Sequence, residues 1–200
     1  MKKDFREAIT HRRSYYDINN QSPIGDEEIK DILEAAIKDV PSAFNSQSAR
    51  YVLLLHEQHK KLWDIVKNTL QKIVPPENFK ATENKINNSF ASGYGTVLFF
   101  EDQEIIENLQ KAFPLYADNF PIWSLESSGM NQFAVWTMLE DAGFGASLQH
   151  YNPLIDDAVK KEWNLNPKWN LIAQMPFGTP TAEPETKKFN PLSERLYIFD

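Results

Sequence analysis

The spacing of apolar residues along the chain predicts seven helices separated by short strands. Apolar residues recur every three to four positions over 26–39, 59–73 and 126–141, which is the repeat of an amphipathic helix. Prolines follow the first two ranges and end both helices, because proline lacks the backbone N–H that a further turn requires. Weaker patterns of the same kind predict four more helices, at 3–12, 77–92, 103–111 and 153–163.

Two unbroken apolar runs, 51–55 and 96–100, have the length of strands. A strand covered on both faces reads as a continuous apolar run, so we predict that 51–55 is a central strand. Shorter strands are predicted at 144–149 and 170–175, and the chain ends in a strand-like segment, 196–199. Helices come in pairs between the strands, which favours an α+β fold with an antiparallel or mixed sheet over a doubly wound parallel one.

Residues 113–123 carry four aromatic side chains and two prolines and predict an ordered loop. The aromatic residues are Phe113, Tyr116, Phe120 and Trp123. Two interpretations remain open for them. Their flat faces either form a lid over an aromatic ligand or pack together as in any ordered loop.

The composition fits one domain over residues 1–200, with a net charge of −7 from 21 basic and 28 acidic side chains. A chain of this length buries roughly 70% of the surface of its unfolded form and needs no disulfides to fold. The absence of cysteine excludes disulfides, thiolate metal sites and a cysteine nucleophile. The acidic balance argues against a nucleic-acid partner.

No apolar run reaches the ~20 residues that cross a bilayer, and residues 1–7 lack the apolar core of a signal peptide. We therefore expect no membrane association and a cytoplasmic location. The C-terminal extension, 176–200, is rich in proline yet ends in an apolar segment. That segment needs burial either on the chain's own sheet or on a neighbouring subunit.

The segment after the first helix, Arg12-Arg13-Ser14-Tyr15-Tyr16, has the side chains of a phosphate site. Arginine presents a planar fork of donors that matches phosphate oxygens. The alternative is a helix C-terminus, which attracts positive charge without any ligand.

Polar side chains crowd residues 41–48, between a helix and a predicted strand. The amides of Asn45 and Gln47 offer both donors and acceptors, and with Ser42 they suit the edge of a planar heterocycle. The alternative is a capped turn in which these side chains bond only to their own backbone.

Lys187 and Lys188 lie in the C-terminal extension and are either a solvated pair or part of a phosphate pocket. If the extension folds back, one of them joins Arg12 and Arg13 in a local cationic notch. The Debye length of about 8 Å at physiological salt shields such a notch from the distant acidic surface.

Several motifs that carry other chemistry fail on spacing. The Gly-x-Gly pairs at 93–95 and 143–145 precede strands and lack the third glycine of a dinucleotide fingerprint. His56 and His59 are three residues apart, which is the wrong spacing for a zinc protease helix. His150 ends a predicted strand and is either a ligand-binding residue or a structural histidine.

Three segments, taken in order, resemble the FMN-dependent nitroreductase family: the basic-Ser stretch at 12–16, the Pro-Ser-x-x-Asn-x-Gln turn at 41–47, and Lys-Lys-Phe-Asn-Pro-Leu at 187–192. Residues 141–147, Asp-Ala-Gly-Phe-Gly-Ala-Ser, also resemble that family. The short chain is similar to a compact subgroup that includes bacterial copper-induced nitroreductases and fungal relatives.

The resemblance implies a nitroreductase-like α+β fold with a central, mostly antiparallel sheet of four to five strands flanked by helices. It also implies an intertwined homodimer with two FMN sites at the subunit interface, in which 176–200 packs on the partner subunit. The expected activity is a ping-pong reduction of small aromatic acceptors, such as nitroaromatics or quinones, with NADH or NADPH as reductant. A flavin-binding sensor or regulatory protein with little turnover is the alternative on the same fold.

By the same resemblance, the residues expected to bind FMN are Arg12, Arg13, Ser14, Tyr16, Ser42, Asn45, Gln47, Gln149, His150, Lys187 and Lys188. The aromatic residues of 113–123 are expected to face the acceptor, and backbone N–H groups of 148–151 to bond flavin N5. No side-chain acid or base is required. The chain departs from the family pattern at Tyr16 and Phe189, where many members carry a basic residue, and at Leu148-Gln149-His150-Tyr151.

Overall fold

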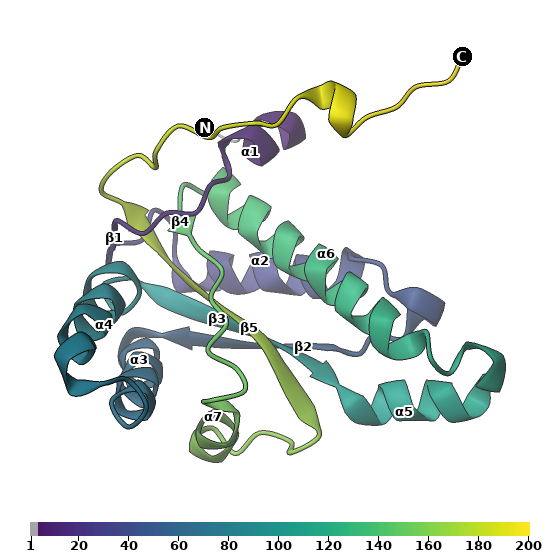
Figure 1. The fold of residues 1–200 in the computed structure, drawn as a ribbon, viewed down its shortest axis with the longest axis horizontal. Helices are drawn as coiled ribbons and strands as arrows, with labels where there is room; N and C mark the ends of the chain where they lie inside the picture. Colours follow the sequence, from purple (N-terminus) through teal and green to yellow (C-terminus); the bar gives the residue numbers. More distant parts are fainter. Residues whose placement is uncertain (1–3) are drawn as a thin grey trace.

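The computed structural model describes residues 4–200, which form seven α-helices around a five-stranded antiparallel sheet (Figure 1). This confirms the predicted α+β class. The helices are α1 (Phe5–His11), α2 (Asp26–Asp39), α3 (His56–Leu70), α4 (Pro76–Ser89), α5 (Gln103–Ala112), α6 (Phe120–Asp141) and α7 (Asp156–Glu162). The strands are β1 (Ile18–Asn19), β2 (Ala49–Leu55), β3 (Gly95–Asp102), β4 (Gly145–Ala146) and β5 (Trp169–Pro180), and three short 3-10 helices are η1 (Ala43–Asn45), η2 (Pro114–Tyr116) and η3 (Leu192–Glu194).

The strand order is β1-β5-β3-β2, with β4 paired to β5. All eight residues of β3 are buried, so β3 and β5 form the centre of the sheet. The prediction that 51–55 is a central strand is wrong, because β2 pairs only with β3 and lies at an edge within the described residues. Its apolar run has another cause: Leu53 packs toward α2 and α6, and Leu54 packs toward α3.

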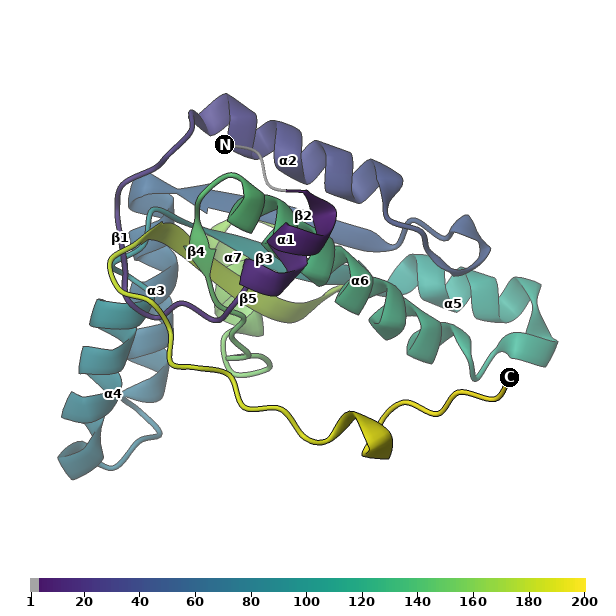
Figure 2. The same cartoon turned by 90° about the horizontal axis from the view of Figure 1, so that it is seen from above.

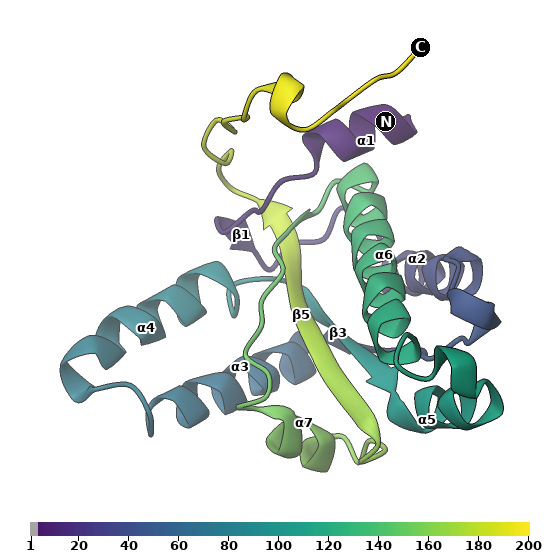
Figure 3. The same cartoon turned by 45° about the vertical axis from the view of Figure 1, so that its right-hand side comes forward.

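Two layers of helices cover the two faces of the sheet. α2 and α6 lie on one face, and α3, α4 and α7 lie on the other (Figures 2 and 3). The first layer buries a cluster built around Val97, Phe99 and Val135. The second buries Trp63, Phe100 and their neighbours. Each face thus has its own core, with β3 contributing alternate side chains to both.

Several predicted boundaries move in the structure. The strand predicted at 170–175 continues to Pro180, because pairing with β3, β4 and β1 overrides the low strand preference of its prolines. The strand predicted at 144–149 shrinks to Gly145–Ala146. The apolar segment 196–199 joins no strand of the described sheet and is exposed. Residue 3 of the predicted first helix lies outside the described residues.

The loop predicted at 113–123 divides between two elements. Phe113 and Tyr116 flank or belong to η2, whereas Phe120 and Trp123 lie in the first turn of α6. Pro121 does not prevent this, because a proline is tolerated in the first turn of a helix, where its missing N–H has no partner to lose. The prediction of a continuous ordered loop is therefore wrong for its second half.

Across residues 4–200, none of the helices combines the length and the apolar composition needed to traverse a bilayer. The same range holds no group of three or more histidine, aspartate or glutamate side chains placed to bind a metal ion. After β5 the chain leaves the sheet beside the segment that follows α1, where Thr181 N donates to Asp17 O at 2.8 Å.

Candidate functional site

The segment after α1 and the C-terminal extension enclose a cavity of about 540 Å³. α1 ends where Arg12 N donates to Ala8 O, and the chain then runs along β4, with Tyr15 N donating to Ala146 O at 2.9 Å. This path places the side chains of residues 12–17 opposite the extension. The lining residues are Arg12, Arg13, Ser14, Tyr15, Tyr16, Asp17, Ala182, Glu183, Pro184, Glu185 and Lys187.

The structure therefore brings Arg12, Arg13, Ser14, Tyr16 and Lys187 together, although Lys187 is more than 170 residues from the arginines. Lys188 is not among the described residues that line this cavity. The extension is held in place here, because Arg13 Nη2 donates to Glu185 O at 2.5 Å.

The cavity is not the purely cationic notch that the sequence predicts. Arg12, Arg13 and Lys187 face an equal number of acidic residues, Asp17, Glu183 and Glu185. The reason is the extension, which brings two glutamates along with its lysine.

Tyr15 lies beside these acidic side chains, and its hydroxyl donates to Glu183 Oε2 at 3.3 Å. Burial, together with the charges of Glu140 and Glu183, raises the pKa of Tyr15 to about 12. The phenol thus remains a neutral donor at physiological pH.

The guanidinium of Arg12 is fixed against α6. Its central carbon lies 4.4 Å from the ring centroid of Trp136 and 5.9 Å from that of Phe133, which is cation–π geometry. Burial lowers the pKa of Arg12. Its Nε is buried and has no hydrogen-bond partner among residues 4–200. A buried donor without a partner is costly, so the cation–π contacts with α6 hold this side chain at the expense of one hydrogen bond.

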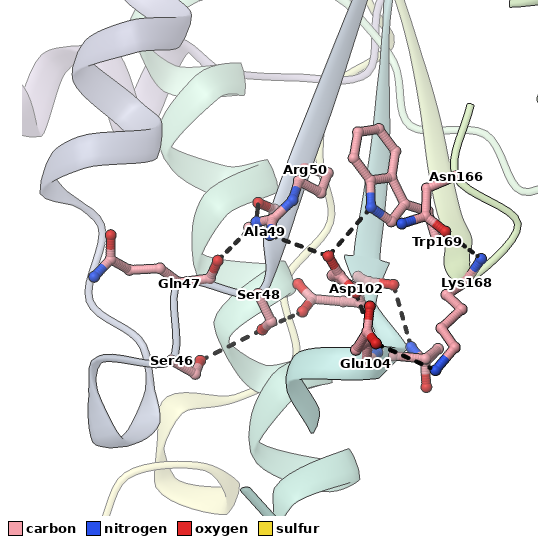
Figure 4. A network of polar contacts seen from close by, with 12 residues as sticks. Ser46, Gln47, Ser48, Ala49, Arg50, Asp102, Glu104, Asn166, Lys168 and Trp169 are labelled. Carbon is pink, nitrogen blue, oxygen red and sulfur yellow. Dashed lines mark hydrogen bonds and ion pairs between the residues drawn. The ribbon is translucent and has the colours of Figure 1, made fainter. Parts of the chain in front are cut away.

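A second cavity, of about 270 Å³, lies between the 42–48 turn, the end of α2 and α6. Ser42, Asn45 and Gln47 all line it, together with Ser127 and Asn131 of α6. Arg50 Nη1 donates to Gln47 O at 2.7 Å and so fixes the end of the turn. Figure 4 shows this contact and the neighbouring polar residues.

The backbone of this turn is strained. Phe44, Asn45 and Gln47 have φ values of 56°, 50° and 50°, a left-handed conformation that residues other than glycine rarely adopt. Ser42 Oγ accepts from Gln47 N at 3.0 Å, so the capped-turn interpretation holds for the Ser42 hydroxyl. The side chains of Asn45 and Gln47 are exposed. Strain of this kind is typical of binding sites.

Phe44 is the residue that sequence reasoning missed. Its ring lies 4.9 Å from Phe113, 5.3 Å from Phe120 and 6.0 Å from Trp123, and it stacks on the last at an interplanar angle of 18°. Tyr116 is the fourth neighbour, at 5.9 Å. The available signal was a single aromatic residue within an otherwise polar turn.

The predicted aromatic lid residues thus form one cluster around Phe44. Phe113 and Tyr116 are about 40–45% exposed, whereas Phe120 is only 3% exposed and fills the base of the cluster. The interpretation as ordinary packing therefore holds for Phe120. Phe44 and Trp123 line a further cavity of about 350 Å³, and Ser127 lines both this cavity and the second one.

The segment 147–152 is tied to β5 by Gln174. Gln149 N donates to Gln174 O at 2.7 Å, and Tyr151 N donates to Gln174 Oε1 at 2.7 Å. These two N–H groups are therefore occupied, and the expectation that they bond a flavin is wrong for both. The Gln149 amide donates to Ser147 Oγ at 3.0 Å. His150 is exposed and does not end a strand.

The two groups of expected FMN-binding residues lie on different sides of α6. Ser127 and Asn131 face the 42–48 turn, while Phe133 and Trp136 face Arg12. At about 100° per residue, Asn131 and Trp136 point roughly 140° apart around the helix. Figure 3 shows α1 near one end of α6 and α5 near the other. One chain therefore does not bring Arg12 and Asn45 together around one small ligand.

Comparison with known proteins identifies the relatives of this chain. A sequence model of the Nitroreductase family matches residues 9–179. Nitroreductase FRM2 of Saccharomyces cerevisiae is 35% identical over 188 residues, which cover 93% of this chain and 93% of the yeast protein.

Solved structures agree. Nitroreductase CinD of Lactococcus lactis, in complex with 4-nitrophenol, is 40% identical with a TM-score of 0.89, over 98% of this chain and 100% of CinD. A nitroreductase-like protein of Desulfovibrio desulfuricans, in complex with FMN, shares the fold at 19% identity and a TM-score of 0.70, over 100% of this chain and 99% of that protein. Since the family model and the yeast relative each span most of its length, this chain belongs to the Nitroreductase family.

Proposed function

We propose that the protein is an FMN-dependent oxidoreductase of the cytoplasm that uses NADH or NADPH to reduce nitroaromatic or quinone-like acceptors by a ping-pong mechanism. Family membership supports a flavoprotein oxidoreductase. The 4-nitrophenol bound to CinD, a relative of 40% identity, supports a small aromatic acceptor. FMN carries the hydride chemistry when bound, and the protein supplies binding and orientation.

The observation that carries this proposal is the cavity built from opposite ends of the chain. Arg12, Arg13 and Lys187 supply cationic donors, and Ser14 and Tyr16 add hydroxyl groups. The guanidiniums of Arg12 and Arg13, which line this cavity, suit anionic oxygens such as those of the FMN phosphate. An occupying phosphate also offsets the desolvation of the Arg12 guanidinium.

The second cavity suits the ring system. The exposed amides of Asn45 and Gln47 offer donors and acceptors to the carbonyls and ring nitrogens of an isoalloxazine. Gln149 and His150 are placed in the proposal at the edge of the ring, and Lys188 near the phosphate. The aromatic cluster around Phe44 orients the acceptor by ring stacking and excludes water from its face.

A homodimer reconciles the two half-sites. Because they lie on different sides of α6, a second copy related by a two-fold axis supplies the 42–48 turn opposite the first copy's Arg12 cavity. The exposed apolar side chains support this arrangement. Phe133 is 40% exposed in the single chain, and Ile198 and Phe199 of the extension are 74% and 93% exposed. In the dimer the extension packs on the partner subunit.

The proposal is tested with one preparation under anaerobic conditions. The purified protein, supplied with FMN, is expected to be yellow, to lose its 450 nm region absorbance on addition of NADH or NADPH, and to regain it when 4-nitrophenol or a quinone is added. A control without reductant keeps its colour. Protein that rejects FMN contradicts the proposal, and yellow protein that neither reductant bleaches favours a sensor instead.

A further inference from the structure

A buried carboxyl group lies beside the 42–48 turn and has no part in the proposed reaction. Glu101, near the end of β3, is 1% exposed. Side chains alternate along a strand, so Glu101 shares the face of Phe99, which packs under α6. Asp102 points to the opposite face, where it pairs with Arg50 at 3.1 Å (Figure 4).

One oxygen of this carboxyl group is linked to the turn. Ser48 Oγ donates to Glu101 Oε2 at 2.6 Å, and Ser46 Oγ lies 3.4 Å from Ser48 Oγ. Figure 4 shows the side chains of Ser46 and Ser48 directed toward each other. The other oxygen, Glu101 Oε1, is buried without a hydrogen-bond partner among residues 4–200.

This environment favours the neutral carboxylic acid. An ionised carboxylate leaves half of its charge on the unpartnered Oε1, so burial raises the pKa of Glu101 to about 7, against the lowering effects of Ser48 and Arg50. Asp102 raises it further. Tyr51, on the neighbouring strand, faces the same core, and burial raises its pKa, so it carries no charge there.

We propose that Glu101 is a positioning residue that acts through Ser48 to hold residues 42–48 in the conformation that binds FMN. The inference rests on the proposed function. The turn needs such support because Phe44, Asn45 and Gln47 all have positive φ, and strained backbone persists only where its surroundings enforce it. Ser48 is the buried residue of the turn, and its hydroxyl connects the turn to the sheet.

Protonation controls this support. In the neutral acid the proton sits on Oε2, so the hydrogen bond reverses and Oε2 donates to Ser48 Oγ, while Oε1 stays an uncharged carbonyl oxygen. Ionisation places charge on an oxygen that no buried donor solvates, and the carboxylate then competes for water by displacing the turn. FMN affinity is therefore expected to fall as pH rises through the titration of Glu101.

The test compares FMN dissociation constants, from quenching of flavin fluorescence, for the wild type and three variants. Glu101→Gln keeps a neutral partner for Ser48 and is expected to match the wild type at acidic pH. Glu101→Ala and Ser48→Ala each break the link and are expected to weaken binding roughly tenfold, with no further loss in the double variant. At alkaline pH the wild type is expected to bind roughly fivefold more weakly than Glu101→Gln. The FMN phosphate titrates equally in both proteins, so this ratio reports Glu101 alone.

Glu104→Gln is the matched control, because it makes the same change at an exposed carboxylate in the first turn of α5. Hydrogen exchange of the amides of 42–48, measured without FMN, is expected to accelerate in Glu101→Ala and Ser48→Ala only. If the wild type binds no FMN, the proposed function fails. If the wild type binds FMN while both link variants match Glu104→Gln in affinity and exchange, the role of Glu101 is overturned.

Discussion

His59 lies in the core between α3 and β3, where its Nδ1 is 2.8 Å from Thr96 Oγ1. Burial lowers the pKa of His59 from 6.5 to about 4, whereas burial raises the pKa of Glu101 from 4.5 to about 7. The two groups therefore act on stability with opposite signs. The folded state binds the His59 proton more weakly than the unfolded chain, so stability is lost as pH falls from 6.5 to 4. It binds the Glu101 proton more tightly, so stability is lost as pH rises from 4.5 to 7.

Between pH 4.5 and 6.5 the gain in stability from His59 and the loss from Glu101 cancel as pH rises. Removing the Glu101 carboxyl group therefore leaves the pH dependence from His59 alone. Glu101→Gln is expected to change the pH profile of the unfolding free energy relative to the wild type by about 1.4 kcal/mol per pH unit in this window, the variant gaining as pH rises. Urea unfolding across the window measures this difference. Parallel profiles for the two proteins would contradict it, and Glu104→Gln provides the parallel reference.

At the scale of single residues, the charged residues of the candidate site were easier to predict from the sequence than the buried ones. Two arginines and a lysine in an acidic chain predict a local anion pocket, and Arg12, Arg13 and Lys187 do line one cavity, but three acidic residues line it with them. Glu101 carries no such signal. In the sequence it follows an apolar run and looks like the polar end of a strand. Its link to Ser48 could not be predicted, because only the pairing of β2 with β3 places Ser48 beside it.

At the scale of elements, the segment 147–152 depends on β5 for its conformation. Gln174 is fully buried, accepts from Tyr151 N and donates from its amide to Asn152 Oδ1 at 3.3 Å. Removing this buried amide leaves the polar groups that it bonds in the neighbouring segment without hydrogen-bond partners. The positions of Tyr151 and Asn152 therefore depend on one side chain of the central sheet, whereas Gln149 is held by the backbone of Gln174.

Gln174→Leu is expected to destabilise the fold by about 1–3 kcal/mol, the cost of an unpaired buried donor. It is also expected to accelerate exchange of the Tyr151 amide, which loses its acceptor, while the Gln149 amide and β3 stay protected. Gln132→Leu is the matched control, because that buried amide donates to Ser128 Oγ on its own helix. Equal exchange over 148–152 in the two variants would show that Gln174 does not hold the segment.

Elements with a strong periodic pattern were predicted well, and those shaped by pairing were not. The expected range 26–39 matches α2, because acidic residues open that helix and Pro41 follows it. β2 looked central because helices cover both of its faces at the edge of the sheet. α6 begins six residues before its expected start, because Pro121 and the aromatic residues around it are compatible with a first helical turn.

At the scale of the whole molecule, α6 separates two incomplete half-sites and leaves apolar side chains facing outward. Phe5, Phe133, Ala134 and Met138 line a groove of about 340 Å³ between α1 and α6. The apolar face of the helix predicted at 126–141 is thus partly open to solvent in the single chain, although its composition is that of a protein core. The proposed homodimer covers it.

Met138→Glu places a charge in this groove and is expected to yield a monomer of 23.1 kDa, where the wild type sediments at twice that mass. Analytical ultracentrifugation measures the mass, and flavin absorbance measures the loss of FMN that accompanies it. Ile73→Glu, at an exposed apolar residue after α3, is the control and keeps the wild-type mass. A Met138→Glu variant that stays dimeric would place the interface elsewhere.

The placement of Arg12 and Asn45 on different sides of one helix has a thermodynamic consequence if the dimer forms as proposed. Each FMN then bridges two polypeptides, and linkage requires that the cofactor tighten self-association by the same factor by which self-association tightens the cofactor. Dilution alone would release the pigment, and a cell short of riboflavin would hold a larger share of unpaired chains.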